Sequence, residues 1–413
     1  MDQVIRQRWG LAAIGGASGL VLHGLSQAID RGALSDRAGL FLIMLVSVYL
    51  TAQLALTGPL TLRRAVLPAA AMAVAVAAML WLASTGFTSV DQMFLAPVNG
   101  LAALVLTFVP LPFLIAALRG NWRSYPVLFT QAWSIVVRFI SAWGFVGLVV
   151  LVLWLSHMLL GLVGMTLLGE LLDEPAVMAT LVGAVLGLAM AVVTEFADLV
   201  SPALVLRLLR LLLPVLLVVL VVFLVALPLR GLSGLFGGLS SAAVLMTITA
   251  LAATLITTAA DESDFEATDS PALIRATQGL ALILILPAAL AVWAVAVRVQ
   301  SYGWTPTRVA AGVLAVLGLG YGAGYLVAIL RGTGWMARVR AVNLGMALVS
   351  LAAAALMMTP ILSPERIAAR SQLARLLEGR TAAPAADISA LADWGKPGAA
   401  AMQRLREQAA QPG

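Results

Sequence analysis

The chain has 413 residues, of which 62% are hydrophobic and only 11% are charged, so it carries far more apolar surface than a soluble globular protein of this length. It contains no cysteine, which excludes disulfides, iron–sulfur clusters, thiolate zinc sites and cysteine nucleophiles. The formal charge of +6 comes almost entirely from arginines in short segments between apolar runs, which fits membrane topology better than nucleic-acid binding.

Eleven apolar runs are long enough to cross the ~30 Å hydrocarbon core of a bilayer as helices. The runs are continuous and do not alternate over ten-residue pieces, which favours helices over the strands of a membrane barrel. The sequence therefore predicts an all-α, polytopic transmembrane helix bundle. The predicted spans are 9–28, 38–57, 65–84, 98–118, 133–160, 176–194, 211–227, 239–259, 276–297, 309–330 and 341–359.

The positions of the arginines predict the orientation of the bundle. The first run follows the N-terminus without a small-residue cleavage site, so we expect it to stay in the protein. With eleven spans, twelve arginines of the short loops and termini fall on one side and five on the other. Since arginine collects on the cytoplasmic side, the N-terminus is expected in the cytoplasm and the C-terminal tail outside.

Glycines and prolines predict how the spans pack and bend. Lipid gives helices no hydrophobic drive toward each other, so close backbone contact through small residues replaces it. Glycines spaced four apart mark such contacts. They are Gly15/Gly19, Gly183/Gly187, Gly318/Gly322 and Gly320/Gly324. Kinks are expected at prolines inside apolar runs, namely Pro110, Pro112, Pro214 and Pro287.

After Pro360 the composition changes to an Ala- and Arg-rich segment. Two short helices are expected there, the first around Leu373 and the second around Met402. The segment has too few large apolar residues for an independent core, so we expect it to dock on the bundle surface. The predicted organisation is a transmembrane helical domain, 1–360, and an extramembrane C-terminal tail, 361–413.

The polar link 298–308 between the ninth and tenth spans has the features of a tight turn at the membrane surface. Gly303 lets the chain reverse, and Thr305 followed by Pro306 is typical of a helix start. Tyr302 and Trp304 suit the headgroup region, where a ring can be apolar at one end and hydrated at the other. Arg298 and Arg308 are candidates for phospholipid headgroup binding, and the structural alternative is that they anchor two helix ends.

Several segments together resemble a known family. The segments are Asn-Trp-Arg-Ser-Tyr-Pro-Val-Leu-Phe-Thr-Gln-Ala-Trp133, Leu-Leu-Gly-Glu-Leu-Leu-Asp-Glu-Pro175, Leu-Leu-Pro214, Tyr-Gly-Trp-Thr-Pro-Thr-Arg308, Tyr321 and Tyr325. The chain resembles the bacterial family of polytopic membrane proteins known as domain of unknown function 4153. The resemblance covers most of the chain from about Asn121 to Leu330 and continues more weakly through 391–398, where Pro397 departs from the expected aromatic or basic residue. The resemblance implies a bacterial inner-membrane protein and assigns no catalytic or binding residues to this chain.

Ionisable groups inside spans are costly, so each is a functional candidate. Arg138 lies five residues into its predicted span, about 7 Å of helix rise, and we expect its long side chain to reach the cytoplasmic headgroups; the alternative is a counter-ion for an anionic substrate or lipid. His23 and His157 fall toward the external ends of their spans. A bis-histidine haem or metal pair is the alternative to two interfacial polar residues, and no cofactor is expected.

Acidic residues gather at two places. Glu195 and Asp198 end the sixth span, where they are either solvated near Arg207 or part of a proton or cation path. The loop 261–269 lacks the glycine and glutamate spacing of a calcium site, so we expect a hydrated charge run. Lys396 is the only lysine and does not lie in a phosphate-binding loop, so P-loop ATP hydrolysis is not expected.

The sequence favours an integral inner-membrane protein without a visible catalytic centre, binding membrane lipid or an envelope protein partner. The alternative is a transporter or channel-like protein for a small or lipidic solute. Proline kinks and Gly-rich spans support transport, whereas the lack of a clear repeat or of paired charges at mid-membrane counts against it. A water-accessible cavity at mid-depth lined by Arg138, Glu195 or His157 would favour the transporter, and a filled bundle would favour the structural role.

Overall fold

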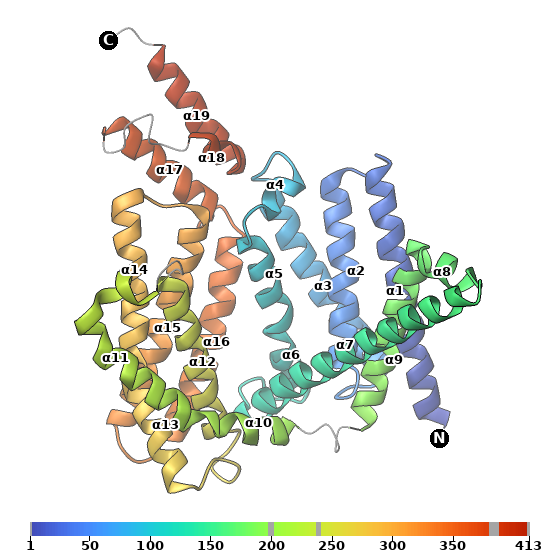
Figure 1. Ribbon diagram of the computed structural model, residues 1–413, viewed down its shortest axis with the longest axis horizontal. Coiled ribbons are helices and arrows are strands. Elements are labelled where there is room, and N and C mark those ends of the chain that lie inside the picture. Colours follow the sequence, from blue (N-terminus) through green and yellow to red (C-terminus); the bar gives the residue numbers. More distant parts are fainter. Residues whose placement is uncertain (1, 197–201, 237–240, 380–387, 411–413) are drawn as a thin grey trace. The chain divides into compact units, whose positions relative to one another are not determined.

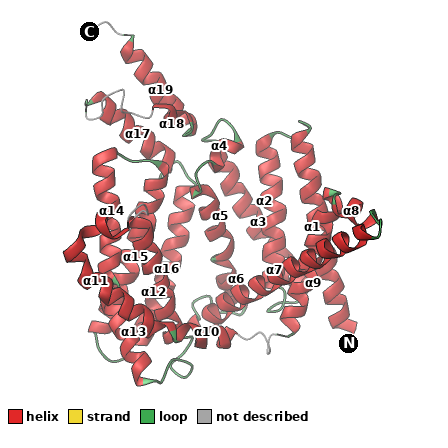
Figure 2. Ribbon diagram, in the orientation of Figure 1, coloured by secondary structure: helices red, strands yellow, loops and turns green. Residues whose placement is uncertain are grey.

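A computed structural model of the chain describes residues 2–196, 202–236, 241–379 and 388–410. Over these ranges the secondary structure is helical, with one isolated β-bridge between Thr57 and Leu60 and no strand (Figure 2). Eleven helical segments of the described chain are long and apolar enough to cross a membrane, and each overlaps one predicted span. The predicted all-α, multi-pass membrane fold is confirmed. The segments are Ile5–Asp30, Asp36–Leu56, Leu62–Ser84, Val98–Leu118, Tyr125–Leu162, Pro175–Glu195, Pro202–Leu229, Ser241–Ala260, Pro271–Tyr302, Pro306–Leu330 and Trp335–Met357.

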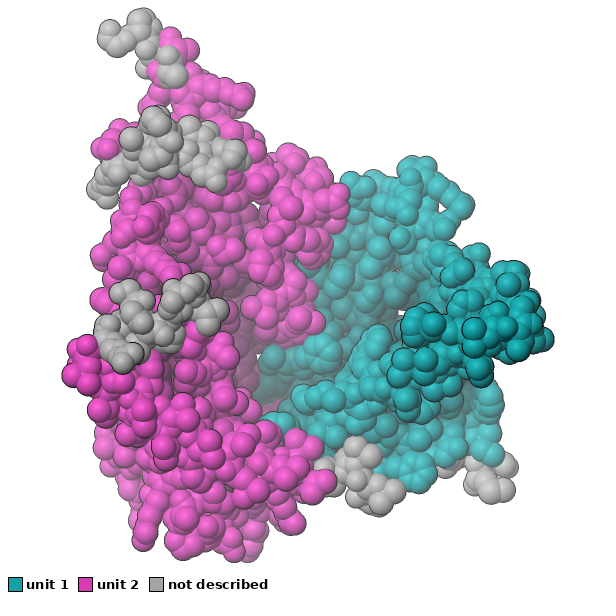
Figure 3. Space-filling view, viewed as in Figure 1, with its two compact units in different colours: residues 1–82, 107–124, 130–202 teal, residues 83–106, 125–129, 203–413 magenta. Residues whose placement is uncertain are grey.

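The helices form two compact units, each built from segments that are distant in sequence (Figure 3). Unit 1 comprises Met1–Leu82, Thr107–Ser124 and Thr130–Pro202, and unit 2 comprises Ala83–Leu106, Tyr125–Phe129 and Ala203–Gly413. The helices in chain order are α1 (Asp2–Asp30), α2 (Asp36–Leu56), α3 (Leu62–Ser84), α4 (Val90–Phe94), α5 (Val98–Phe108), α6 (Pro110–Leu118), α7 (Tyr125–Leu162), α8 (Leu167–Leu172), α9 (Pro175–Glu195), α10 (Pro202–Arg210), α11 (Leu212–Phe236), α12 (Ser241–Ala260), α13 (Pro271–Ile283), α14 (Ile285–Tyr302), α15 (Pro306–Leu330), α16 (Trp335–Met357), α17 (Pro364–Leu377), α18 (Ile388–Ala392) and α19 (Gly395–Ala409).

Three of the spans each consist of two helices that meet close to a proline. Pro110 is the first residue of α6, and Pro214 and Pro287 are the third residues of α11 and α14. A proline cannot donate a hydrogen bond to the carbonyl four residues earlier, and its ring crowds that carbonyl. The helix breaks before these three prolines therefore confirm the predicted kinks, while Pro112 lies inside α6 without a break of its own.

In unit 1 the helices α1 and α9 approach each other through their backbones. A Cβ on Gly15 would collide with the carbonyl oxygen of Gly183, and one on Gly19 with that of Ala179. In the opposite direction, a Cβ on Gly187 would collide with the carbonyl oxygen of Leu11. The two predicted glycine pairs are thus the contact surface of one helix pair, where backbone dispersion contacts replace side-chain packing.

Four glycines of α15 allow close packing in unit 2 in the same way, against three neighbouring helices. A Cβ on Gly318 would meet Thr249 of α12, and one on Gly322 would meet the backbone of Ile285 at the start of α14. Gly320 and Gly324 face Met346 and Val342 of α16. The doubled glycine pair therefore lets α15 pack among three helices at once, as the sequence predicts.

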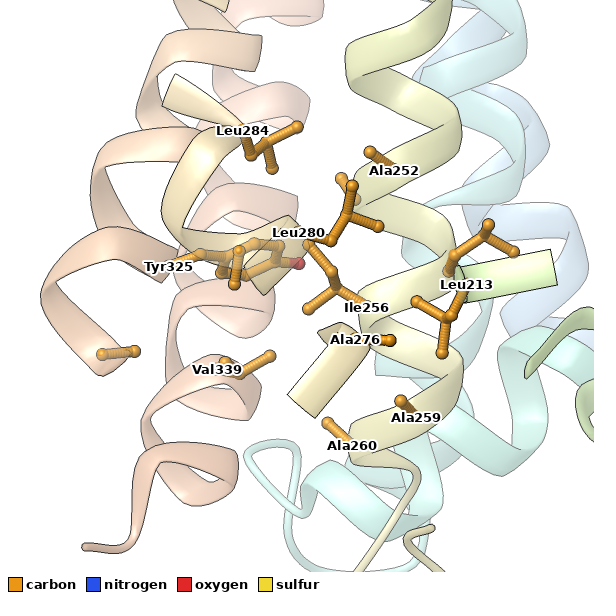
Figure 4. Packing of buried hydrophobic residues seen from close by; sticks show 14 of the residues in the cluster. Leu213, Ala252, Ile256, Ala259, Ala260, Ala276, Leu280, Leu284, Tyr325 and Val339 are labelled. Atoms are coloured by element: carbon orange, nitrogen blue, oxygen red, sulfur yellow. The ribbon is translucent and has the colours of Figure 1, made fainter. Parts of the chain in front are cut away.

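The core of unit 2 is built from α11, α12, α13, α15 and α16 around the fully buried Tyr325 (Figure 4). The Tyr325 ring reaches from α15 toward Leu280 and Ile256. Its hydroxyl donates to Asn343 Oδ1 and lies 3.2 Å from Thr257 Oγ1. This polar group is satisfied inside an otherwise apolar cluster, which buried hydroxyls require.

The three helices after residue 360, α17 to α19, pack as part of unit 2. A small cluster of Leu373, Leu391 and Ala401 holds them together, with Trp394 and Met402 against it. The predicted pair of short tail helices is therefore present, with α18 between them. The predicted placement of this tail outside the membrane stays a prediction.

Gly15→Ala should destabilise the protein, because the added methyl group forces α1 and α9 apart along their backbone contact. The expected loss is about 1–3 kcal/mol of unfolding free energy, typical of overpacking a close contact. Thermal unfolding of the purified full-length protein measures it. Gly24→Ala is the matched control on the same helix, since nothing lies within 4 Å of a Cβ there. Equal melting temperatures for the two variants would contradict this account of the helix pair.

Candidate functional site

The link 298–308 joins α14 to α15 and folds as its sequence predicts. Gly303 has a φ of +75°, in the region that glycine adopts without steric cost. Thr305 Oγ1 accepts a hydrogen bond from the Arg308 N–H at 3.3 Å, and Pro306 is the first residue of α15. The predicted turn and helix cap are confirmed.

Helix α17 binds the backbone of this link through polar side chains. The Gln372 amide donates to the carbonyl oxygens of Tyr302 at 2.9 Å and Trp304 at 3.0 Å. The Trp304 N–H donates to Ser371 Oγ at 3.1 Å. Figure 1 shows α17 at the ends of α14 and α15. The tail thus provides hydrogen-bond partners for backbone groups of Tyr302 and Trp304 at the turn.

Arg375 of α17 adds a charged contact to the last turn of α14. Its two terminal nitrogens donate to the carbonyl oxygens of Gln300 at 2.9 Å and Ser301 at 2.7 Å. A cation at a helix C-terminus also interacts favourably with the helix dipole. A Cβ on Gly303 would lie 2.7 Å from Arg375 Cδ, so a larger residue there would displace the Arg375 side chain as well as strain the turn, where the φ of this residue is +75°. We call Gln372 and Arg375 the tail latch.

A cavity of about 660 Å³ lies in unit 2 among α17, α18, the α3–α5 connection and the ends of α12, α14 and α15. Arg298 and Arg308 bring two cations to its wall, one from each end of the link. Met93, Met246 and Val295 contribute apolar surface. We call this space the tail cavity. Its wall therefore offers both charged groups and apolar surface to one ligand.

The wall of the tail cavity also contains two carboxyl groups, Glu365 and Asp393. Glu365 is only 6% exposed, and its Oε2 accepts a hydrogen bond from Ser363 Oγ at 3.0 Å. Burial raises the pKa of Glu365 above its ordinary value, and hydrogen bonds from the Glu365 backbone, Ser363 and Asn99 offset part of that rise. At a given pH, the neutral form of Glu365 is therefore more populated than the neutral form of an exposed glutamate.

The structure brings together only some of the predicted positions of the link. Arg298 and Arg308 share the tail cavity, while Tyr302 and Trp304 do not line it. Tyr302 is 66% exposed, with the Arg308 guanidinium 5.6 Å from its ring centre. Trp304 is half-buried against Gly312. An exposed tyrosine beside an arginine suits a headgroup region, as predicted.

Arg138 belongs to unit 1, and the prediction that it reaches the headgroups is wrong. It is 6% exposed and donates to the carbonyl oxygens of Ala55, Thr57 and Ser134, each at 3.2 Å. Two of these carbonyls lie at the C-terminus of α2, where no intrahelical donor remains. The carbonyls come from a helix 81 residues away in sequence, so the span pattern alone could not indicate them.

Glu195 is ion-paired, which corrects the prediction of a solvated carboxylate near Arg207. Arg8 Nε lies 2.9 Å from both of its oxygens, and Arg8 Nη2 donates to Oε2. The pair joins α1 to the end of α9 in unit 1. Its companion candidate, Asp198, lies outside the described residues.

The two histidines of unit 1 occupy different surroundings. His23 lines a mostly apolar cavity of about 560 Å³ among α1, α2, α7 and α9. His157 of α7 packs on Gly169 of α8, where a Cβ would collide with its ring, and its buried Nδ1 has no hydrogen-bond partner. Across the described chain, no three His, Asp or Glu side chains gather closely enough to hold a metal ion.

The acidic loop 261–269 is partly buried, so the prediction of a hydrated charge run is wrong for its first residue. Asp261 is buried and paired with Arg210, and the more exposed Asp264 pairs with Arg340 at 2.7 Å. Arg340 also donates to the carbonyl oxygen of Ala260 at the end of α12. The loop therefore ties α10, α12 and α16 together by charge.

No family model, curated protein or solved structure matches the chain. The functional proposal therefore rests on the residues themselves.

No role for Glu365 or for the tail latch is predicted from the sequence. The Ser-Pro-Glu start of α17 is a recognisable helix cap, and Ser363 does accept from the Arg366 N–H. Nothing local indicates that Glu365 is buried or that Arg375 reaches α14.

Removing the tail latch should loosen α17 from the bundle. In Arg375→Ala the carbonyls of Gln300 and Ser301 lose their donors, so we expect faster amide hydrogen exchange in α17 and earlier proteolysis after residue 360. Arg370→Ala is the matched control, because Arg370 is exposed on the same helix. Equal exchange in α17 for both variants would show that the latch does not hold the tail.

Glu365 should make the protein less stable as pH rises. Because its folded-state pKa is raised, the folded protein keeps a proton that the unfolded chain loses above its pKa of about 4.3. The stability is present below that pH and is lost as pH rises through the folded-state pKa. The melting temperature of Glu365→Gln relative to wild type should therefore increase with pH over this window. Glu407→Gln, an exposed carboxyl in α19, should show no such trend.

Proposed function

We propose that the protein is a non-catalytic, multi-pass component of a bacterial inner membrane that binds an anionic lipid headgroup in the tail cavity. The observation that carries the proposal is the pairing of Arg298 and Arg308 with apolar surface in one cavity of about 660 Å³. Guanidinium groups bind phosphate through two parallel hydrogen bonds. Met93, Met246 and Val295 suit the glycerol and first acyl carbons behind such a headgroup.

The charge of the tail cavity supports an anionic ligand. Two arginines face two carboxyl groups, but the raised pKa of Glu365 favours its neutral, hydrogen-bonding form. The raised pKa of Glu365 therefore reduces the negative charge that the wall sets against Arg298 and Arg308.

The position of the arginines supports a lipid as the source of the anion. Arg298 is in the last turns of α14, and Arg308 is the third residue of α15. The ends of membrane-spanning helices lie near the headgroups, where basic pockets bind lipid phosphates. A bacterial inner-membrane location belongs to the same proposal, and it draws on the family resemblance, whose most specific part is the Tyr-Gly-Trp-Thr-Pro-Thr-Arg308 segment of the link.

A second candidate function is transport of a lipidic solute. The open cavity of about 560 Å³ in unit 1 favours it, because helices α1, α2, α7 and α9 border a mostly apolar space with His23, Ser47 and Thr51 as polar groups. Arg138, Glu195 and His157 are the residues that the sequence predicts would line a transport cavity. Of these three, only Arg138 lines a cavity described in unit 1. Lipid flipping by the protein in vesicles would distinguish transport from binding alone.

Lipid binding is tested by removing the two cations of the tail cavity. The double variant Arg298→Gln/Arg308→Gln should bind phosphatidylglycerol about tenfold or more weakly than wild type, a loss of about 1.4 kcal/mol or more. Native mass spectrometry of the purified protein with titrated lipid measures this. Arg331→Gln is the matched control, an exposed arginine of the same unit outside the cavity.

A second variant separates loss of charge from disturbance of the link. Ala243→Trp fills the tail cavity from an exposed position of α12 and leaves both arginines in place. It should also weaken lipid binding while the melting temperature stays close to that of wild type. Undiminished phosphatidylglycerol binding in both cavity variants would refute the proposed site.

A further inference from the structure

A buried cation without a carboxylate distinguishes unit 1. Arg210 and Arg340 of unit 2 are half-buried, with side chains 12% and 11% exposed, and each pairs with an aspartate. Arg138 is 6% exposed, yet among the described residues no carboxylate lies within ion-pair distance of it. A buried charge is costly unless an opposite charge compensates it.

The hydrogen bonds of Arg138 use four of its five N–H groups and do not neutralise its charge. Its acceptors are three backbone carbonyls and, at 3.5 Å, the hydroxyl of Thr194. All are neutral dipoles. A purely structural role as the cap of α2 therefore accounts for the geometry of the guanidinium but leaves a net positive charge inside unit 1.

Next to this charge is a cavity of about 240 Å³, which we call the Arg138 cavity. Arg119 supplies a second cation to its wall, and Ser134 and Thr194 supply hydroxyl groups. Gln131 also lines it, and the buried Oε1 atom of that side chain has no hydrogen-bond partner. An amide can present its NH₂ group in the place of its oxygen after a half-turn, so Gln131 is able to donate to an anion there.

We propose that the Arg138 cavity binds a phosphate group, with Arg138 and Arg119 as its cations and Gln131 as a further donor. The volume exceeds that of several waters, each of about 30 Å³, so a tetrahedral oxyanion fits with part of its hydration. Phosphate matches the planar donor fork of Arg119, while Arg138 contributes its charge and its remaining N–H group. The phosphate belongs either to a lipid headgroup or to a free ion, and both present the same oxygens to these side chains.

The decisive variant is Gln131→Glu, which supplies a carboxylate in place of the bound anion. Delipidated full-length protein in an uncharged detergent is titrated with inorganic phosphate in one arm and with short-chain phosphatidic acid in the other, at constant ionic strength set by chloride. The melting temperature is the readout. Wild type should be stabilised saturably, and Gln131→Glu should be at least as stable as wild type without ligand and should respond to neither arm.

Two further variants distinguish loss of ligand binding from loss of folding stability. Arg119→Gln removes an exposed cation and should weaken the response about tenfold without changing the ligand-free melting temperature. Arg63→Gln, an exposed arginine of unit 1 outside the cavity, should respond like wild type. A response to phosphatidic acid alone assigns the phosphate to lipid, and a response to both assigns it to any phosphate of suitable size.

The proposal is overturned if wild type responds in neither arm, or if Gln131→Glu responds as wild type does. A response that is absent in wild type and gained in Asp198→Asn would also overturn it, because a carboxylate of the chain would then be the counter-charge. Since this test uses unit 1 and the lipid test above uses Arg298 and Arg308, either site can fail without the other.

Discussion

The last carbonyl groups of a membrane helix have no donor within the helix, and lipid provides none. In both units arginine side chains satisfy these carbonyls. They do so at the ends of α2 (Arg138 to Ala55 and Thr57), α12 (Arg210 to Thr258, Arg340 to Ala260 and Asp261), α14 (Arg375 to Gln300 and Ser301) and α15 (Arg338 to Ala328 and Gly332). One guanidinium reaches two or three carbonyls because its five N–H groups form a planar fork. This geometry is a physical reason for a chain with many arginines and a single lysine.

With helix ends capped in this way, small residues can hold the middles of the helices together. In unit 1, Gly15 and Gly183 bring the backbones of α1 and α9 into direct contact. In unit 2, Tyr325 is fully buried, and its hydroxyl is satisfied by Asn343 and Thr257. The polar group at the centre of the unit 2 core is therefore paired within the protein. The arginines that act as caps also bring positive charge to places where helices end.

The sequence predicts what depends on neighbouring residues and misses what depends on distant ones. Apolar length predicts all eleven spans, and the Gly303, Thr305 and Pro306 pattern predicts the turn and cap of the link. The partners of Arg138 and Glu195 are 81 and 187 residues away, and no pattern of hydropathy shows them. Counting arginines by side of the membrane also treats each as a solvated charge. Arg138 and Arg340 instead donate to backbone carbonyl groups of the chain. This is why the solvated interpretations of Arg138 and Asp261 are wrong.

The same constraint decides where this chain can recognise an anion. The cavity of unit 1 that contains no arginine is mostly apolar, with His23, Ser47 and Thr51 as polar groups among apolar walls. A cavity bordered by helix ends contains the arginines that gather there, as in the tail cavity and the Arg138 cavity. Carbonyl dipoles fix a guanidinium in place but leave its charge, since dipoles carry no net charge. An arginine that caps a helix without a carboxylate is thus already oriented and desolvated before any ligand arrives. Binding an anion at such a place needs little further ordering of the protein, which is the condition under which a few contacts give useful affinity.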